Sequence, residues 1–146
     1  MHREEYRPFI SSQKILFKAQ CELAVKYHLP IIIHSRADFV GTLEVLQTLE
    51  ALPQNIYFHC WGYLPAELEI LKNRLDKRSY STQLFVGFCG NISYPKAQEL
   101  RDCFQYCLDN NINILIETDA PFLAPQAIRG QTNTPANIVH TYAYIS

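Results

Sequence analysis

Residues 30–34 read Pro-Ile-Ile-Ile-His, a short run of β-branched apolar residues that ends at a histidine. Three comparable apolar runs follow along the chain, at residues 55–58, 84–88 and 114–116. Short runs of this composition are typical of β-strands. Strands that are apolar throughout, without alternation, are buried on both faces, as they are in parallel sheets. The sequence therefore predicts four parallel strands.

Segments with helical spacing of apolar residues separate these runs. The predicted helices cover residues 11–28, residues 39–50, a segment that opens at Pro65 and a segment that opens at Pro95. Proline is favoured at the first helical position, which supports the last two starts. In the first helix, Ile15, Ala19 and Leu23 are spaced to share one face. A loop rich in Pro, Gly, Asn and Gln follows the last strand, and another helix then begins.

This alternation predicts an α/β fold, either an open doubly wound sheet or a (β/α) barrel. No glycine-rich turn follows the first strand, which weighs against a dinucleotide-binding fold. Closing a barrel takes about eight strands. We therefore expect residues 1–146 to form a single domain, a partial TIM-type barrel of four parallel strands alternating with helices. The N-terminal strands and the C-terminal helix of the full barrel are expected to be missing.

Composition narrows the class of protein. Net charge is −1, so a general basic field for nucleic acid is absent, although a metal and a few local cations can still hold phosphates. The five cysteines are odd in number and contain no CxxC pair, which argues against a disulfide framework. Cys103 and Cys107 are expected to pack in the core as small apolar residues. With no apolar run near the roughly 20 residues of a membrane span and no apolar leader, we expect a cytoplasmic protein without membrane association.

Three polar side chains lie at or just past the carboxyl ends of the predicted strands: His34, His59 and Asp119. In a parallel barrel these ends form the catalytic face. Imidazole and carboxylate groups together suit zinc, manganese or a similar divalent ion. A single histidine at a strand end is more often bonded to backbone, but three such residues at equivalent positions favour a metal site.

Several blocks of sequence resemble the signature motifs of the TatD family of metal-dependent deoxyribonucleases. They are residues 31–36 (Ile-Ile-Ile-His-Ser-Arg), residues 58–62 (Phe-His-Cys-Trp-Gly), residues 116–125 (Ile-Glu-Thr-Asp-Ala-Pro-Phe-Leu-Ala-Pro), residues 90–97, and Arg129-Gly130 with Asn133 and Pro135. Their order and spacing also match. The resemblance covers essentially the whole chain.

The resemblance implies a (β/α)₈ barrel, similar to that of the amidohydrolases, with two divalent ions (Mg, Mn or Zn) at its carboxyl face. It implies that His34 and His59 ligate one ion. Asp119 would ligate the other and act as the catalytic residue that orients or deprotonates water. Arg36 and Arg129 would contact substrate phosphate. The implied activity is hydrolysis of DNA phosphodiester bonds, with DNA as substrate and no obligate protein partner.

The chain departs from the family pattern in what it lacks. Neither the His-x-His pair of the family's first strand nor the later metal-bridging Glu occurs in it. We therefore expect this chain alone to be nearly inactive. The alternatives are a metal-dependent hydrolase of another amide or phosphoester, or a catalytically inactive half-barrel.

Glu117 is expected to orient neighbouring groups. The basic residues Lys72, Arg74, Lys77 and Arg78 are interpreted as a solvated segment rather than as a DNA contact.

Overall fold

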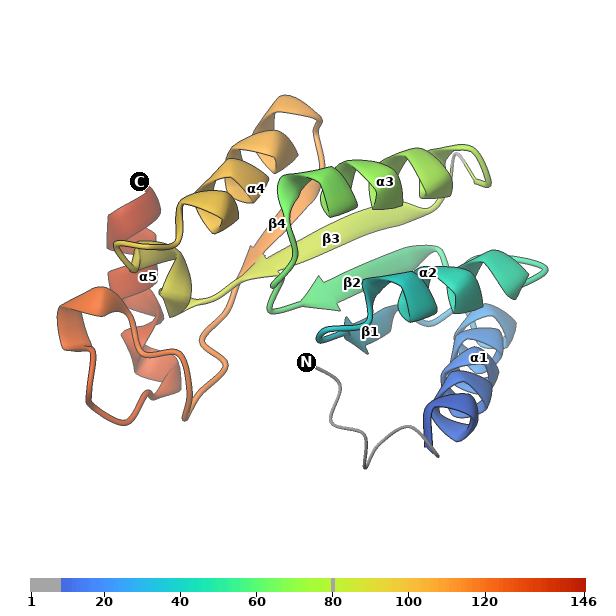
Figure 1. The fold of residues 1–146 in the computed structure, drawn as a ribbon, viewed down its shortest axis with the longest axis horizontal. Helices are drawn as coiled ribbons and strands as arrows, with labels where there is room; N and C mark the ends of the chain where they lie inside the picture. The colour runs from blue at the N-terminus through green and yellow to red at the C-terminus, as the bar shows by residue number, and fades with distance from the viewer. Residues whose placement is uncertain (1–8, 80) are drawn as a thin grey trace.

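The structure, a computed structural model, describes residues 9–79 and 81–146. The charged N-terminal stretch, including Glu4 and Glu5, lies outside the described residues. The helices and strands, shown in Figure 1, are α1 (Ile10–Lys26), β1 (Ile31–His34), α2 (Phe39–Thr48), β2 (Asn55–His59), α3 (Pro65–Asp76), β3 (Gln83–Phe88), α4 (Gln98–Asp109), β4 (Asn113–Ile116) and α5 (Ile138–Ile145). Short 3₁₀ turns lie at η2 (Gly90–Ser93), η3 (Gln126–Ile128) and η4 (Pro135–Asn137).

The strands form one sheet in the order β1-β2-β3-β4, and every neighbouring pair is parallel. A helix links each strand to the next, which parallel pairing requires. The fold class predicted from the sequence, four parallel strands alternating with helices as in a TIM-type barrel, is confirmed. Because β1 and β2 end in register at His34 and His59, their carboxyl ends lie at the same edge of the sheet.

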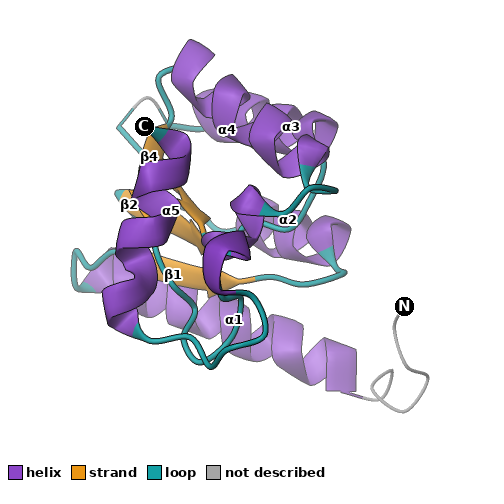
Figure 2. Cartoon of the chain, turned by 90° about the vertical axis from the view of Figure 1, so that its left-hand side faces the viewer, coloured by secondary structure: helices purple, strands orange, loops and turns teal. Residues whose placement is uncertain are grey.

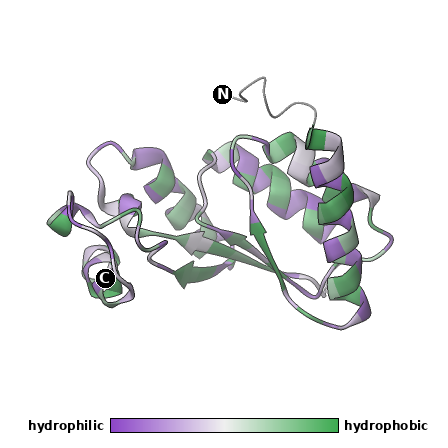
Figure 3. Ribbon diagram, turned by 90° about the horizontal axis from the view of Figure 1, so that it is seen from below, coloured by the Kyte–Doolittle hydropathy of each residue, from purple (hydrophilic) through white to green (hydrophobic). Residues whose placement is uncertain are grey.

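The core lies between the sheet and the helices. Phe58, Val86 and Phe88 are fully or almost fully buried on that face of the sheet, against Leu68 and Leu71 of α3. Figures 1 and 2 show α2, α3 and α4 on the same side of the strands. Hydrophobic residues run through the strands and along parts of each helix in Figure 3. The helix-facing side of the sheet is thus a closed apolar layer.

Helix α1 is present, but the face expected to be buried is not. Ile15 is 71% exposed and Leu23 is 51% exposed. Cys21 and Ala24 are buried instead and join the core. The helix carries apolar residues on more than one side, so spacing alone did not identify the side that meets α2 and the sheet. The face that Ile15, Ala19 and Leu23 share is therefore not the buried face of this helix.

Helix α4 begins at Gln98, three residues after the predicted start at Pro95. The η2 turn and the residues after it occupy the intervening space. The guanidinium of Arg101 donates to the carbonyls of Ile92, Tyr94 and Pro95. The Arg101 side chain therefore provides hydrogen-bond donors for loop carbonyls that would have bonded to backbone N–H groups if the helix had begun earlier.

The cysteines behave as the sequence predicted. Cys103 and Cys107 are completely buried in the core, and all five cysteines are free thiols. Burial raises the pKa of Cys103 to about 11 and that of Cys107 to about 12, so both stay protonated at neutral pH. No helix within residues 9–79 and 81–146 combines the length and the apolar character needed to span a membrane.

Candidate functional site

His34, His59 and Asp119 meet at the carboxyl edge of the sheet. The rings of His34 and His59 lie with their centroids 5.6 Å apart. The Nε2 atom of His59 is 3.3 Å from Oδ1 of Asp119. Asp119 and Cys60 both have positive φ, 52° and 50°, so the chain turns sharply just after each strand. Non-glycine residues held in this conformation are concentrated at functional sites.

Glu117 holds the other side of the His59 ring. Its Oε2 lies 2.5 Å from Nδ1 of His59, and its Oε1 accepts a hydrogen bond from the backbone N–H of Cys60. A carboxylate on one ring nitrogen fixes the orientation of an imidazole and leaves the other nitrogen to bind a ligand. The arrangement agrees with the orienting role expected for Glu117, and it directs Nε2 of His59 towards Asp119.

The loop that carries Asp119 is fixed by Asn133, which is 3% exposed. The side-chain amide of Asn133 donates to the carbonyls of Thr118 and Phe122, at 2.8 and 2.7 Å. The Phe122 N–H donates in turn to the Asp119 carbonyl. Because the loop is bonded both within itself and to Asn133, Asp119 has a defined position beside His59.

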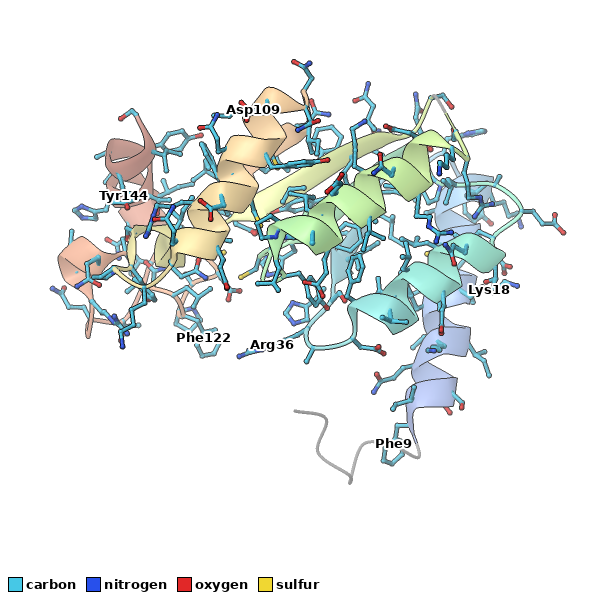
Figure 4. All side chains as sticks on the ribbon, turned by 45° about the horizontal axis from the view of Figure 1, so that its top comes forward. Phe9, Lys18, Arg36, Asp109, Phe122 and Tyr144 are labelled. Carbon is cyan, nitrogen blue, oxygen red and sulfur yellow. The ribbon has the colours of Figure 1, made fainter. Side chains whose placement is uncertain are left out.

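A cleft of about 540 Å³ opens at this edge. His34, Arg36 and Asp119 line it, and so does Phe122, whose ring is 67% exposed. Figure 4 shows Arg36 and Phe122 at the same edge of the molecule. A 2.6 Å hydrogen bond between the hydroxyls of Ser35 and Tyr63 ties together the loops that follow β1 and β2. Arg36 therefore lies beside the candidate metal ligands, as expected.

Arg129 lies elsewhere. Its guanidinium stands over the ring of Tyr94, 4.3 Å from the ring centroid. It lines a neighbouring pocket that does not include His34, Arg36 or Asp119. The structure thus groups four of the five predicted site residues and places Arg129 in the adjacent pocket.

A family model for TatD related DNase matches residues 2–146 of the chain. The chain belongs to the TatD family. Its relatives include an uncharacterized metal-dependent hydrolase of Mycoplasma genitalium, MG009, which is 28% identical over 138 residues (94% of this chain and 50% of that protein). Another is the uncharacterized metal-dependent hydrolase YcfH of Escherichia coli, 30% identical over 118 residues (80% of this chain and 40% of that protein).

The human 3′-5′ RNA nuclease TATDN2 is 30% identical over 121 residues, which are 82% of this chain and 15% of that protein. The chain therefore spans about half, or less than half, of the length of these TatD relatives.

The carboxylates of Glu117 and Asp119 make the surroundings of the His59 ring favourable for positive charge. Burial by itself would lower the pKa of His59, but the hydrogen bond and charge of Glu117, with smaller effects of Cys60 and Asp119, outweigh it and raise the pKa. The surroundings of the ring therefore stabilise positive charge. Imidazole and carboxylate are also ligands that divalent ions accept, and a bound ion would take the place of the proton, because a metal-bound imidazole is neutral.

The donor atoms fit part of a metal site. Nε2 of His59 and Oδ1 of Asp119 lie 3.3 Å apart, and an imidazole nitrogen and a carboxylate oxygen are donor atoms that divalent ions accept. Within the described part of the chain, no group of three or more His, Cys, Asp or Glu side chains is gathered closely enough to hold an ion alone. His34, His59 and Asp119 are the residues that could contribute ligands, as part of a larger ligand set.

Two residues of the site were missed by sequence reasoning, Gly87 and Tyr57. A Cβ on Gly87 would lie 2.3 Å from Oε1 of Glu117 and 2.5 Å from the Tyr57 hydroxyl, so only glycine leaves room for both groups. Burial, followed by the hydrogen bond and charge of Glu117, raises the pKa of Tyr57. The available signal was the single glycine inside an apolar strand, which often marks a close approach.

Proposed function

We propose that this chain supplies one side of the catalytic centre of a metal-dependent hydrolase that cleaves phosphodiester bonds in DNA. The observation that carries the proposal is His59, held at Nδ1 by Glu117 and paired at Nε2 with Asp119, beside a cleft that also contains Arg36. Membership of the TatD family supports it, as do relatives named as metal-dependent hydrolases and as a nuclease. We further propose that residues 1–146 act as a single unit of a TIM-type barrel.

The proposed cofactor is a pair of divalent ions, Mg, Mn or Zn. When bound, such ions polarise a phosphoryl oxygen and activate water for attack. His34 and His59 would ligate one ion, and Asp119 the other. The closeness of His59 and Asp119 is compatible with neighbouring ligand positions, since the paired ions of such sites lie only about 3.5–4 Å apart.

The chain's own residues have separate tasks in this proposal. Glu117 keeps the His59 ring fixed through Nδ1. Asp119 orients the attacking water and accepts its proton at a carboxylate oxygen, a role that needs a group within hydrogen-bond reach of the water. Arg36 neutralises phosphate charge in the cleft, and Arg129 is a second substrate contact, made from the adjacent pocket. Local cations suffice for this because the chain as a whole has a net charge of −1.

DNA is the proposed substrate, and no obligate protein partner is proposed. A cytoplasmic location is also proposed, since all five cysteines are free thiols and reducing compartments keep them so. Two alternatives differ in what they predict. A hydrolase of another amide or phosphoester would use the same site on small substrates, because fold alone does not set substrate. An inactive half-barrel would hydrolyse nothing.

The test is complementation. The 146-residue chain is assayed with Mn²⁺ or Mg²⁺ on single-stranded DNA, both alone and together with the part of the Escherichia coli relative that the match leaves out. We expect little or no cleavage by the chain alone and metal-dependent cleavage by the mixture. Cleavage of small amides or esters but not of DNA would favour the first alternative. No hydrolysis of any substrate by the mixture would favour the second.

Asp119→Asn in the same mixture should lower the rate of DNA cleavage at least about 100-fold, because the amide is a poor ligand and a poor proton acceptor. Asp109→Asn is the matched control, since Asp109 lies at the exposed end of α4 and its carboxylate accepts, among residues 9–79 and 81–146, only from Gln105. Activity of the Asp119→Asn protein within a few-fold of the unchanged chain would remove Asp119 from the mechanism.

A further inference from the structure

A second pocket, of about 620 Å³, lies next to the cleft. Its volume is within the range of about 300–1,000 Å³ found for ligand sites. The two cavities share the wall residues Trp61, Gly62, Asn91 and Leu123. The loops after β2, β3 and β4 build the pocket entirely from described residues. A molecule in the cleft can therefore extend one of its groups into this pocket.

The pocket combines aromatic walls with a charged mouth, in which two cations, Lys96 and Arg129, face one carboxylate, Glu99 of α4. Tyr63 and Tyr94 line it, and Lys96 and Arg129 are exposed beside them. The Tyr94 hydroxyl donates to the Ala124 carbonyl at 2.9 Å, which fixes the plane of the ring. Arg129 already stacks on that ring. A flat aromatic and a flat guanidinium, both held in place, are the surfaces on which nucleobases stack.

Asn91 supplies a hydrogen-bonding group at the boundary between the two cavities. Its side-chain Oδ1 is buried and has no hydrogen-bond partner among the described residues. Its backbone carbonyl accepts from the Tyr94 N–H, so the residue is anchored in the η2 turn. A buried acceptor without a donor is unfavourable. Oδ1 exposes less than 1 Å² of surface, so a ligand with an N–H group on a flat edge would satisfy it by drawing the Asn91 side chain towards the cavity.

We propose that this pocket binds the base of a nucleotide whose phosphate lies in the cleft. The inference rests on the proposed function and adds to it the place of the base. The base stacks on the outer face of the Arg129 guanidinium, which Tyr94 supports from behind, and an amino group on its edge donates to Oδ1 of Asn91 when that side chain turns towards the cavity. A base in this position is withdrawn from any duplex, because its faces and its edge are engaged by protein. Unpaired strands and frayed ends are therefore the substrates the pocket accepts.

The test is binding without metal, read from Trp61. This is the only tryptophan of the chain, and it lies in the wall shared by both cavities. Its fluorescence is followed during titration with deoxyadenosine 5′-monophosphate and, separately, with deoxyribose 5-phosphate. We expect saturable binding of the nucleotide and binding at least about fivefold weaker for the sugar phosphate, since stacking one base contributes about 1–3 kcal/mol. Equal affinity for the two compounds would overturn the proposal.

Variants separate stacking from structure. Tyr94→Leu should weaken nucleotide binding roughly tenfold, whereas Tyr94→Phe, which loses only the bond to Ala124, should bind nearly as the unchanged chain does. Arg129→Gln tests the same surface if Tyr94→Leu does not fold. The matched control is Tyr27→Leu, because Tyr27 also carries a cation over its ring, Lys26 at 5.1 Å, on the distant helix α1. Unchanged binding in a folded Tyr94→Leu or in Arg129→Gln would overturn the proposal.

The two proposals fail separately. Base-dependent binding in a chain whose complemented form cleaves no DNA would support the pocket and refute the nuclease activity. DNA cleavage without base-dependent binding would refute the pocket alone. Asn91→Ala should reduce the affinity for deoxyadenosine monophosphate and leave that for deoxyribose 5-phosphate unchanged; an equal loss for both would contradict the role given to Oδ1.

Discussion

The two faces of the sheet are made from similar residues but differ in what covers them. In β1, Ile31 and Ile33 are buried under the helices, whereas Ile32 between them is 69% exposed. At the other edge of the sheet, Leu115 of β4 is 41% exposed on the same side as Ile32. The helix-covered face is a complete core. On the open face, no second layer lies over these residues within the described part of the chain.

The site belongs to the open face. Residues two apart in a strand point the same way, so His34 shares the side of Ile32, and His59 shares the side of Tyr57. Gly87 lies opposite Leu115 in the register, on that side as well. The covered face therefore supplies stability, and the open face carries the candidate site at its carboxyl edge. A substitution on the covered face should therefore lower the free energy of unfolding more than a matched substitution on the open face.

Phe58→Ala should have the largest effect on stability. Phe58 is 2% exposed in the centre of the covered face, and removing a buried phenylalanine costs about 3–5 kcal/mol of the free energy of unfolding. The comparison is Leu115→Ala on the open face, for which we expect a loss of about 1 kcal/mol, because the side chain is already 41% exposed in the folded chain. Urea denaturation followed by circular dichroism measures both. Equal losses would show that the two faces are equally packed.

Gly87→Ala should have an intermediate effect, of about 1–3 kcal/mol, because the added methyl group must displace the Glu117 carboxylate and the Tyr57 hydroxyl. The His59 ring should also lose its fixed position, which its NMR resonances would report. Gly62→Ala is the matched control, since a Cβ there would meet only the Cys60 carbonyl, at 3.8 Å. If Gly87→Ala left both stability and the His59 resonances unchanged, the close packing around Glu117 would be disproved.

The sequence was sufficient for the fold because its signal is local. Four apolar runs separated by helical periodicity define parallel strands and their order, and the observed sheet follows them. The same local signal failed for α1, where Ile15 and Leu23 are exposed and Cys21 is buried. Which side of a helix meets the sheet depends on the docking of distant elements, and apolar residues on several sides leave that choice open.

The sequence predicted which residues meet at the site but not the contacts between their side chains. Strand ends of a parallel sheet meet at one edge, so the convergence of His34, His59 and Asp119 followed from topology. The contacts of Glu117 with His59 and Cys60 depend on how β2, β3 and β4 are aligned, which no spacing in the sequence records. The position of Arg129 could not be predicted for the same reason. Its guanidinium stacks on Tyr94, which lies 35 residues earlier in the sequence on another loop.

Arg78→Ala should cost about 1–2 kcal/mol, and Lys77→Ala almost nothing. Arg78 was interpreted as part of a solvated basic segment, but its guanidinium donates to the carbonyls of Leu46 and Leu49 at the end of α2. That correction follows from tertiary structure, since cations stabilise the carbonyl end of a helix and charged hydrogen bonds are stronger than neutral ones. Thermal unfolding of the two variants at low salt measures the difference. Equal melting temperatures of the two variants would show that Arg78 contributes no more to stability than the solvated Lys77 does.

The smallest effect is expected for Ile32→Ala, and it is the most direct test of the open face. Its neighbour Ile33 is 4% exposed, so Ile33→Ala should lose about 2–5 kcal/mol of the free energy of unfolding. Ile32→Ala should lose less than about 0.5 kcal/mol, as surface substitutions usually do. The two residues have the same side chain, the same strand and adjacent positions, so only the covering of the two faces distinguishes them.

A large loss for Ile32→Ala would mean that another layer covers the open face in solution. A second copy of the chain is one such layer, and stability would then rise with protein concentration, because association stabilises the folded state by mass action. Repeating the denaturation of the unchanged chain over a hundredfold range of concentration separates the two cases. A midpoint that does not move, together with a small loss for Ile32→Ala, is the result expected of a sheet with one covered face.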